Sequence, residues 1–258
     1  MSTVKIARYY GQDGEILEGV VEGDELQEIS GLDTMLHGGR RLGAYRKLAD
    51  LSFAPWGLGR KIVLIGRNYG AHAKELGNEV PKEPLIFIKP TSSLVGHGEA
   101  IVLPRGSDNV HHEAEVAVVI GKRLKGASEA ECAKAVAGVT CLNDVTARDI
   151  QKREVQFTRA KGFDTFCPVG PWVTVGLDPS DLRVQCRVNG ETKQDGRTSD
   201  LVFSVPALLA FICAGMMLEA GDIVSTGTPA GVGPIVAGDV VEVEVEGVGV
   251  LRNPVRAP

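Results

Sequence analysis

A chain of 258 residues is long enough for one large domain or for a domain with a small appendage. Its 43% hydrophobic and 24% charged residues are those of an ordinary globular protein, and a net charge of −5 without any long basic run argues against nucleic acid as a partner. No stretch approaches the ~18 consecutive apolar residues of a membrane-spanning helix, and the N-terminus lacks the apolar core of a signal peptide. We therefore expect a cytoplasmic protein without a membrane partner.

The cysteine content predicts the state of the thiols in the core, and the glycine and proline contents predict the number of tight turns. The five cysteines are odd in number and include no C-x-x-C pair, so we expect reduced thiols in the core rather than disulfides or a zinc site. The 32 glycines and 13 prolines predict many tight turns, as in a β-rich fold. The cysteines are Cys132, Cys141, Cys167, Cys186 and Cys213.

The first part of the chain reads as a small unit of strands. Residues 4–10, 16–23 and 25–29 are short apolar runs separated by glycine-containing turns. A polar and possibly helical stretch then extends to Arg46-Lys47, and a proline- and glycine-rich loop follows near residue 57. These features predict a small β-rich N-terminal domain at residues 1–58 and a larger domain at 59–258.

A strand followed by a helix opens the larger domain. The apolar run 61–66 leads into residues 67–77, whose helical spacing places His72 and Glu75 on one face, three residues apart. A carboxylate that bonds one ring nitrogen of a histidine fixes its tautomer and makes the other nitrogen a better base. In isolation, a chance pair on an exposed helix surface explains the same spacing.

The stretch HHEAEVAVVIG, residues 111–121, is the strongest single signal of chemistry. Its β-branched residues predict a strand, on which Glu113 and Glu115 point to the same face. Two carboxylates held together repel each other unless something neutralises them, and oxygen ligands of this kind suit Mg²⁺, Mn²⁺ or Ca²⁺. The alternative is a solvated strand start, as in the alternation of valine and glutamate at residues 240–246. Unlike that segment, the residues after Glu115 are apolar on both faces.

Further elements follow in order. We expect a helix from Ser128, with Glu131 completing a capping box, to Ala137. A strand over 139–146 ends near Asp144, a third carboxylate in a place where enzymes expose functional groups.

The rest of the chain is expected to alternate loop, hairpin and helix. A short helix is expected at 147–156, and residues 158–173, which include Lys161, are expected to form an irregular loop across a site. Asn189-Gly190 predicts a hairpin turn and Ser204 caps a helix over 204–219. A buried strand then runs into a glycine-rich turn that contains Thr228, and residues 239–255 form half-buried strand.

The order of these motifs resembles the fumarylacetoacetate hydrolase family over roughly residues 60–252. The resemblance is closest to short prokaryotic members known as acylpyruvate hydrolases, oxaloacetate decarboxylases and 2-hydroxyhepta-2,4-diene-1,7-dioate isomerases. It implies an α+β, β-rich fold, namely a mixed rolled β-sandwich that carries a metal, and a homodimer. The motifs are GRNYGAHAKE, FIKP, HHEAE, LNDVTARDIQ, TRAKGFDTFCPVGPW and TGTPAGVG.

The resemblance also implies roles for individual residues. Glu113, Glu115 and Asp144 match metal-binding carboxylates, His72 the catalytic histidine and Glu75 its partner. The animal enzyme that names the family has a further metal-binding aspartate, which is absent here at Ile65-Gly66; a site of three carboxylates that keeps waters suits Mg²⁺. Lys161 matches an active-site lysine, and the residues expected near the substrate are Arg67, Gln151 and Thr228.

This site predicts chemistry on a small 2-oxo acid or dicarboxylate. The metal and Lys161 would stabilise an enolate, and His72 with Glu75 would activate water. The leading hypothesis is Mg²⁺-dependent C–C hydrolysis of an acylpyruvate-like β-diketo acid, as in the catabolism of aromatic compounds. Isomerisation of a dienoic diacid, oxaloacetate decarboxylation and keto–enol tautomerisation stay open, because all use the same groups. A non-catalytic metal- or dicarboxylate-binding protein is a remote alternative.

Overall fold

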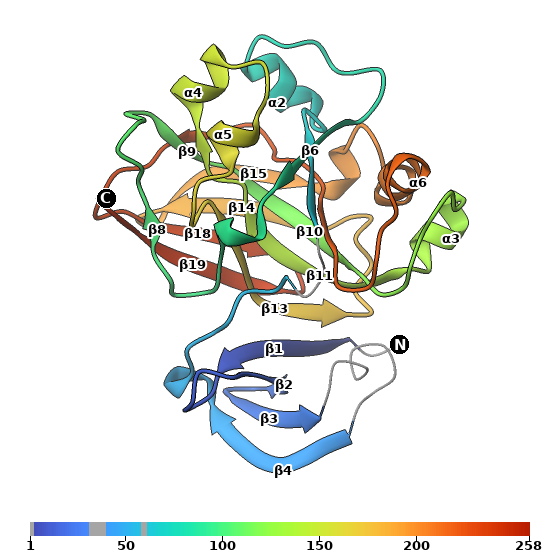
Figure 1. The fold of residues 1–258 in the computed structure, drawn as a ribbon, viewed down its shortest axis with the longest axis vertical. Helices are drawn as coiled ribbons and strands as arrows, with labels where there is room; N and C mark the ends of the chain where they lie inside the picture. The colour runs from blue at the N-terminus through green and yellow to red at the C-terminus, as the bar shows by residue number, and fades with distance from the viewer. Residues whose placement is uncertain (1–2, 31–39, 58–60) are drawn as a thin grey trace.

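The computed structural model describes residues 3–30, 40–57 and 61–258, and it is built mainly of strands (Figure 1). The described strands form three sheets, most of whose pairs are antiparallel, with parallel pairs between β16 and β5, β13 and β7, and β19 and β8. The β-rich α+β class expected from the sequence is confirmed. The strands are β1 Val4–Tyr10, β2 Ile16–Glu22, β3 Glu25–Ser30, β4 Arg40–Lys47, β5 Ile62–Gly66, β6 Leu85–Lys89, β7 Leu94–Val95, β8 Ile101–Val102, β9 Val110–His112, β10 Ala114–Ile120, β11 Val136–Asn143, β12 Thr146–Ala147, β13 Cys167–Val175, β14 Arg183–Val188, β15 Glu191–Arg197, β16 Ile223–Ser225, β17 Gly233–Pro234, β18 Val240–Val245 and β19 Gly249–Arg256.

The largest sheet combines the N-terminal strands β1–β4 with strands from the middle of the chain and with β16. Its strands follow the order β4-β3-β2-β1-β13-β11-β10-β16-β5-β6, and β7 also pairs with β13. The second sheet has the order β15-β14-β18-β19-β8, and the small third sheet has the order β12-β9-β17. In Figure 1, β1–β4 lie below the other strands, and the elements that carry the short helices α2, α4 and α5 lie at the opposite end.

Strand β10 lies in the core with both of its faces covered. Val116 and Val118 belong to the larger apolar cluster, which also contains residues of the second sheet, whereas Ala117 and Val119 belong to a separate cluster with β5 and β13. All seven residues of the strand are buried. A strand buried on both faces reads as a continuous apolar run, which explains the sequence that follows Glu115.

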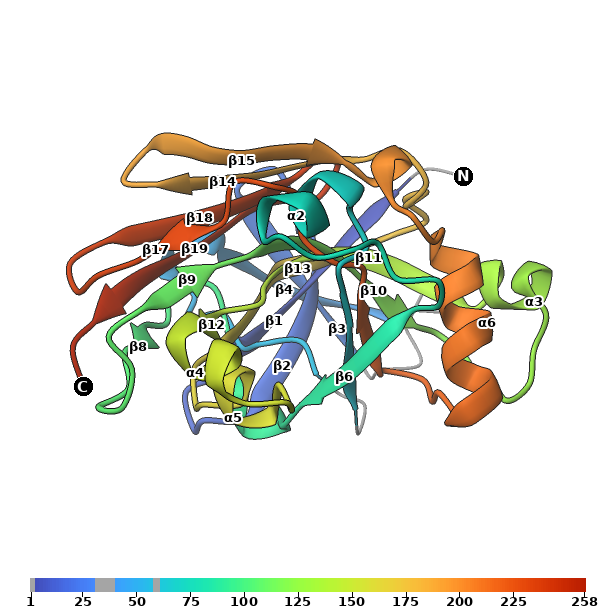
Figure 2. The ribbon, with the colours of Figure 1, turned by 90° about the horizontal axis from the view of Figure 1, so that it is seen from above.

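The helices are short and lie at the periphery. The α-helices are α2 Gly70–Glu75, α3 Glu129–Ala133, α4 Arg148–Arg153, α5 Thr158–Lys161 and α6 Val205–Gly215, and the 3-10 turns are η1 Leu48–Asp50, η2 Thr91–Ser93 and η3 Thr198–Asp200. Helices α3 and α6 pack side by side at one edge, whereas α4 and α5 lie together near β9 and β12 (Figure 2). No helix in the described ranges is both long and apolar enough to cross a bilayer.

Several local predictions are confirmed. Ser128 and Glu131 form the expected capping box, although α3 ends at Ala133 rather than Ala137. Ser204 caps α6, which ends at Gly215. The β14–β15 hairpin turns at Asn189-Gly190 with φ of 53° and 82°, as a type I′ turn requires. All five cysteines are free and buried.

Two predictions of local structure are wrong. The polar stretch that ends at Lys47 is strand β4 where it is described; its polarity arises because it is an edge strand, with Arg41 and Arg46 paired to glutamates of β2 and β3. Residues 158–173 are irregular only at 162–166, because the others form helix α5 and most of β13. Glycine and proline within β13 interrupt the sequence pattern that predicts a strand. In the structure, a register shift in the pairing of β13 with β11 accommodates these residues.

The N-terminal strands are hydrogen-bonded into the main sheet. Strand β1 pairs with β13, from Val4 opposite Val175 to Ala7 opposite Trp172. The predicted boundary between residues 58 and 59 lies outside the described residues, so the division into domains 1–58 and 59–258 stays a prediction.

Candidate metal and active site

Three buried carboxylates converge at one end of β10 and β11. The two strands are antiparallel with Ala114 opposite Asn143, so Glu113 precedes one strand at the point where Asp144 follows the other. The Asp144 N–H donates to the Glu113 carbonyl at 2.8 Å, which fixes the two residues together. Oxygen atoms of Glu113, Glu115 and Asp144 all lie within 4.8 Å of one another. This set is the one that the sequence predicts.

Three cationic side chains surround these carboxylates. Lys161 Nζ lies 3.0 Å from Glu113 Oε2 and 2.5 Å from Asp144 Oδ2. Lys89 Nζ donates to Asp144 Oδ1 at 2.6 Å, and the Arg148 guanidinium pairs with Glu113. All of these groups are buried. Isolated charges are costly in such a place, so the cations balance the carboxylates.

Glu115 has a different environment from the other two carboxylates. Its Oε2 accepts hydrogen bonds from the Ser225 hydroxyl and, at 3.0 Å, from the Gly227 N–H, and no cation pairs with it among the described residues. Burial, with a further contribution from the charge of Asp144, raises the pKa of Glu115 to about 8.

The pKa values of Glu113 and Lys161 shift toward their charged forms. Burial opposes ionisation of Glu113, but Lys161 and Arg148 outweigh it, so its pKa falls below its usual range. Burial likewise opposes the charge of Lys161, and Asp144 and Glu113 reverse the effect, so the pKa of that ammonium rises. The site therefore keeps its ion pairs at neutral pH.

The three carboxylates fit a hard divalent cation. Oxygen donors are the ligands that Mg²⁺, Mn²⁺ and Ca²⁺ prefer. Glu115 supports this assignment, because it pairs with no cation among the described residues and a divalent ion beside it would supply positive charge. The residues that would hold the ion are Glu113, Glu115 and Asp144.

Helix α2 presents the His72–Glu75 pair. The helix ends in a Schellman motif, in which Gly77 adopts a φ of 68° and the Asn78 N–H donates to the Ala73 carbonyl at 2.8 Å. His72 Nδ1 lies 3.3 Å from Glu75 Oε2, and Glu75 Oε1 accepts from the Gly231 N–H at 3.0 Å. The glutamate thus joins the histidine to the glycine-rich turn after β16.

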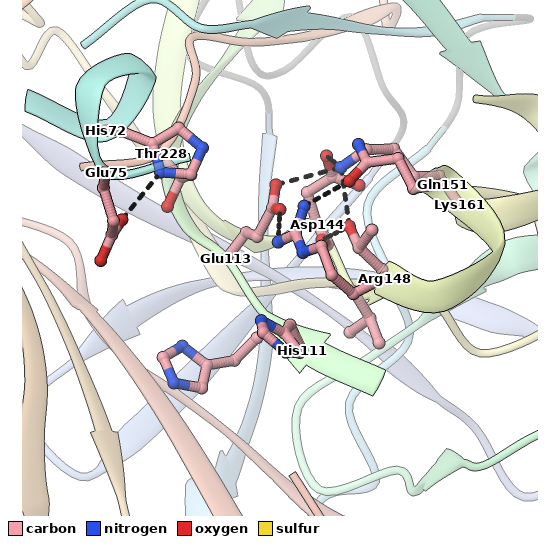
Figure 3. A network of polar contacts seen from close by, with 12 residues as sticks. His72, Glu75, His111, Glu113, Asp144, Arg148, Gln151, Lys161 and Thr228 are labelled. Atoms are coloured by element: carbon pink, nitrogen blue, oxygen red, sulfur yellow. Dashed lines mark hydrogen bonds and ion pairs between the residues drawn. The ribbon is translucent and has the colours of Figure 1, made fainter. Parts of the chain in front are cut away.

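A single cavity of about 250 Å³ brings the predicted residues together. His72 and Thr228 lie on one side of Glu113, and Arg148, Gln151 and Lys161 lie on the other (Figure 3). Glu75 is the one predicted residue that does not line the cavity, which it reaches through His72. The lining residues are Ile65, Gly66, Arg67, His72, Leu76, Asn78, Phe87, Glu113, Glu115, Asp144, Arg148, Gln151, Lys152, Phe157, Lys161 and Thr228.

A tight turn after β5 places Arg67 at this cavity. Arg67 has a φ of 59°, which is uncommon for a residue other than glycine. The buried Asn68 fixes the turn, because its amide donates to the carbonyls of Thr226 and Phe203 at 2.8 and 3.1 Å and accepts from the Phe203 N–H at 2.9 Å. Backbone strain held in this way is typical of functional sites.

Sequence reasoning missed two of the cations. Arg148 follows Asp144 by four residues, and a guanidinium so close to a predicted ligand is the signal that could have revealed it. Lys89 ends the apolar run LIFIK, where a buried lysine requires an anionic partner. The histidines of HHEAE bond to other groups: His111 Nε2 lies 2.9 Å from Asn109 Oδ1, and His112 Nδ1 lies 3.0 Å from Gln194 Oε1.

Comparisons with known proteins agree on the family. The family model described as Fumarylacetoacetate (FAA) hydrolase C-terminal matches residues 61–256. The chain is 40% identical over 209 residues to the mitochondrial oxaloacetate tautomerase of Bos taurus, covering 79% of this chain and 95% of that protein. It is 42% identical over 199 residues to the mitochondrial oxaloacetate decarboxylase of Dictyostelium discoideum, covering 74% and 91%. The crystal structure of 5-carboxymethyl-2-hydroxymuconate delta-isomerase from Mycobacterium smegmatis is 40% identical with a TM-score of 0.90, covering 98% and 100%.

Proposed function

The chain belongs to the fumarylacetoacetate hydrolase family, and we propose that it is a divalent-metal-dependent enzyme that acts on a short 2-oxo acid through its enolate. The observation that carries this proposal is that His72, backed by Glu75, opens onto the same cavity as three buried carboxylates. The cavity also holds Lys161 and Arg148, which suit a substrate that develops negative charge.

The side chains divide the work between proton transfer and charge stabilisation. Glu75 holds the Nδ1 side of His72, so that Nε2 is the atom that removes a proton from C3 of the 2-oxo acid. Lys161 and Arg148 offer positive charge to the oxygen on which the enolate charge develops. A bound divalent cation would supply Lewis-acid stabilisation of the substrate oxygens. Mg²⁺ is the ion that we propose, with Mn²⁺ and Ca²⁺ as substitutes.

We place the keto–enol conversion of oxaloacetate first among the reactions that can follow. In this reaction the proton that leaves C3 returns to the 2-oxo oxygen, so one base is sufficient and no bond between carbons breaks. A tautomerase, a decarboxylase and an isomerase, each at least 40% identical to this chain, support chemistry limited to the enolate.

Hydrolysis of an acylpyruvate-like β-diketo acid is the second candidate. Here His72 activates a water molecule that attacks the distal carbonyl, and the C–C bond breaks to give a carboxylic acid and a 2-oxo acid enolate. The observation that favours it is the exposure of Glu75, whose side chain is 34% accessible, since this leaves room for water beside the pair.

A substrate comparison tests both candidates. Purified protein with Mg²⁺ is incubated with oxaloacetate, acetylpyruvate and 5-carboxymethyl-2-hydroxymuconate, and enol formation, CO₂ release and C–C cleavage are followed separately. We expect enol–keto conversion of oxaloacetate to have the highest kcat/KM. Faster cleavage of acetylpyruvate would reverse the order of the two candidates, and no turnover of any substrate would favour a non-catalytic binding protein.

We propose further that the protein works as a homodimer in the cytoplasm, as the family resemblance implies. Light scattering after size exclusion tests the first part. A mass near 27.4 kDa rather than twice that value would refute it.

A further inference from the structure

Gln194 lies outside the cavity but bonds directly to the groups that frame it. It belongs to β15, the edge strand of the second sheet, and is 1% exposed. Its Oε1 accepts from the Ala114 N–H and lies 3.0 Å from both that nitrogen and His112 Nδ1. Its Nε2 donates to Thr228 Oγ1 at 2.7 Å and to the Pro229 carbonyl at 2.8 Å. All four hydrogen-bonding positions of this amide are occupied.

The backbone partners fix the orientation of the amide and of the groups around it. The Ala114 N–H can only donate and the Pro229 carbonyl can only accept, so Oε1 and Nε2 of Gln194 are not interchangeable. His112 must therefore carry its proton on Nδ1. The Thr228 hydroxyl, which accepts from Gln194, must direct its own proton to the Ala114 carbonyl at 2.8 Å.

This network ties the metal-binding strand to the turn that closes the cavity. Ala114 lies between the carboxylates Glu113 and Glu115, and Thr228, which lines the cavity, donates to the Ala114 carbonyl. The turn also packs on β15, because a Cβ atom on Gly231 would lie 2.1 Å from the Lys193 carbonyl. Gly231 is the residue whose N–H holds Glu75. The Gln194 side chain thus bonds both the segment between the two glutamates and the turn that carries Thr228.

We propose that Gln194 is a positioning residue, which holds Thr228 against the Glu113–Glu115 segment so that the cavity accepts the carboxylate end of a 2-oxo acid. This inference rests on the proposed function for the identity of the ligand. The carboxylates themselves keep other partners, namely Arg148 and Lys161 for Glu113 and Ser225 and Gly227 for Glu115. Loss of Gln194 should therefore weaken ligand binding far more than cation binding.

Calorimetry with Mg²⁺ and then oxalate, a stable mimic of a 2-oxo acid, tests the proposal without turnover. Gln194→Met keeps the length of the side chain and removes its hydrogen bonds, and we expect the Kd of oxalate to rise about tenfold while that of Mg²⁺ changes less than threefold. Gln194→Glu keeps the shape but replaces both donations by an acceptor, and it should weaken oxalate binding at least as much. Gln185→Met on β14 is the matched control, because that amide donates to Asp195 away from the cavity.

A double-mutant cycle separates positioning from general support of the fold. If Gln194 acts through Thr228, Thr228→Val should weaken oxalate binding about as much as Gln194→Met, and the double variant should lose less than threefold beyond either single variant. The proposal would be overturned if the increases in the Kd of oxalate caused by the two single substitutions multiply in the double variant. An unchanged Kd in Thr228→Val would also overturn it. If Gln194→Met melts far below the parent protein, Gln194→Glu takes its place in the cycle. If none of the three substrates is turned over but the cycle shows the expected coupling between Gln194 and Thr228 in oxalate binding, only the proposed function is refuted.

Discussion

Cation binding should release a proton from Glu115. In the metal-free protein, burial and the charge of Asp144 raise the pKa of this carboxyl to about 8. At pH 7 it is therefore protonated in about 0.9 of the molecules, since the ratio of acid to carboxylate is about ten to one. A divalent cation requires the carboxylate, so each binding event at pH 7 should release about one proton. Nothing comparable is expected at pH 9, where the group is already ionised.

The same equilibrium sets the pH dependence of the affinity. Below pH 8 the apparent affinity for Mg²⁺ should rise about tenfold per pH unit, which corresponds to about 1.4 kcal/mol, and it should level off above pH 8. The sign follows from a raised pKa: the free protein holds a proton that the bound protein has lost, so a higher pH favours binding. Glu115 is the carboxylate concerned, because the pKa of Glu113 is shifted the opposite way.

Titration calorimetry in buffers of different ionisation enthalpy measures the number of protons released. Mg²⁺ is titrated into metal-free protein at pH 6, 7, 8 and 9, with Glu115→Gln as the control that removes the titrating group. The reasoning is refuted if proton release at pH 7 is near zero, or if it stays constant from pH 6 to pH 9. Undiminished release in Glu115→Gln would assign the proton to another group.

Three further predictions concern the groups around the carboxylates. His72→Asn should lower kcat at least a hundredfold and leave the calorimetric Mg²⁺ affinity within threefold, because the histidine is placed as a base and not as a ligand. Arg67→Leu should lower kcat/KM about tenfold for oxaloacetate and less than threefold for acetylpyruvate, which lacks a second carboxylate for the guanidinium to bind; equal losses would contradict this. Lys89→Met should destabilise the metal-free protein by about 3 kcal/mol in denaturant titrations, because it leaves Asp144 with one cation fewer, and saturating Mg²⁺ should recover part of the loss.

The sequence located the carboxylates through the order of the motifs that resemble the family, and the strand pairing explains why these three residues meet. An apolar run after Glu115 indicates a strand buried on both faces, and an apolar run before Asp144 indicates a similar neighbour. Antiparallel pairing of two such strands brings the start of one beside the end of the other. The glutamates of β18 have the same spacing, but they belong to a half-buried strand whose other face is exposed to solvent.

The groups that balance the site could not be located in this way. Lys89 approaches Asp144 from β6, which lies beyond β16 and β5 in the sheet order, so its contact depends on topology rather than on local pattern. Gln194 reaches the site from a different sheet. The sequence of its hairpin predicts the turn but not the contact with Ala114. Strand β13 was missed because its prolines and glycine read locally as loop, whereas its pairing on both sides comes from tertiary structure.

The pairing of β1 with β13 gives the N-terminal strands a protective role. Strand β13 bonds β11 along one side, and its other side is covered by β1 at residues 172–175 and by β7 at Cys167-Pro168. Without residues 1–57, the buried Val173 and its neighbours would form an open sheet edge with unpaired backbone groups. Such an edge recruits strands from other molecules. A truncated chain that retains every residue of the candidate site should therefore aggregate, so the first strands decide whether the site persists in solution as a single species.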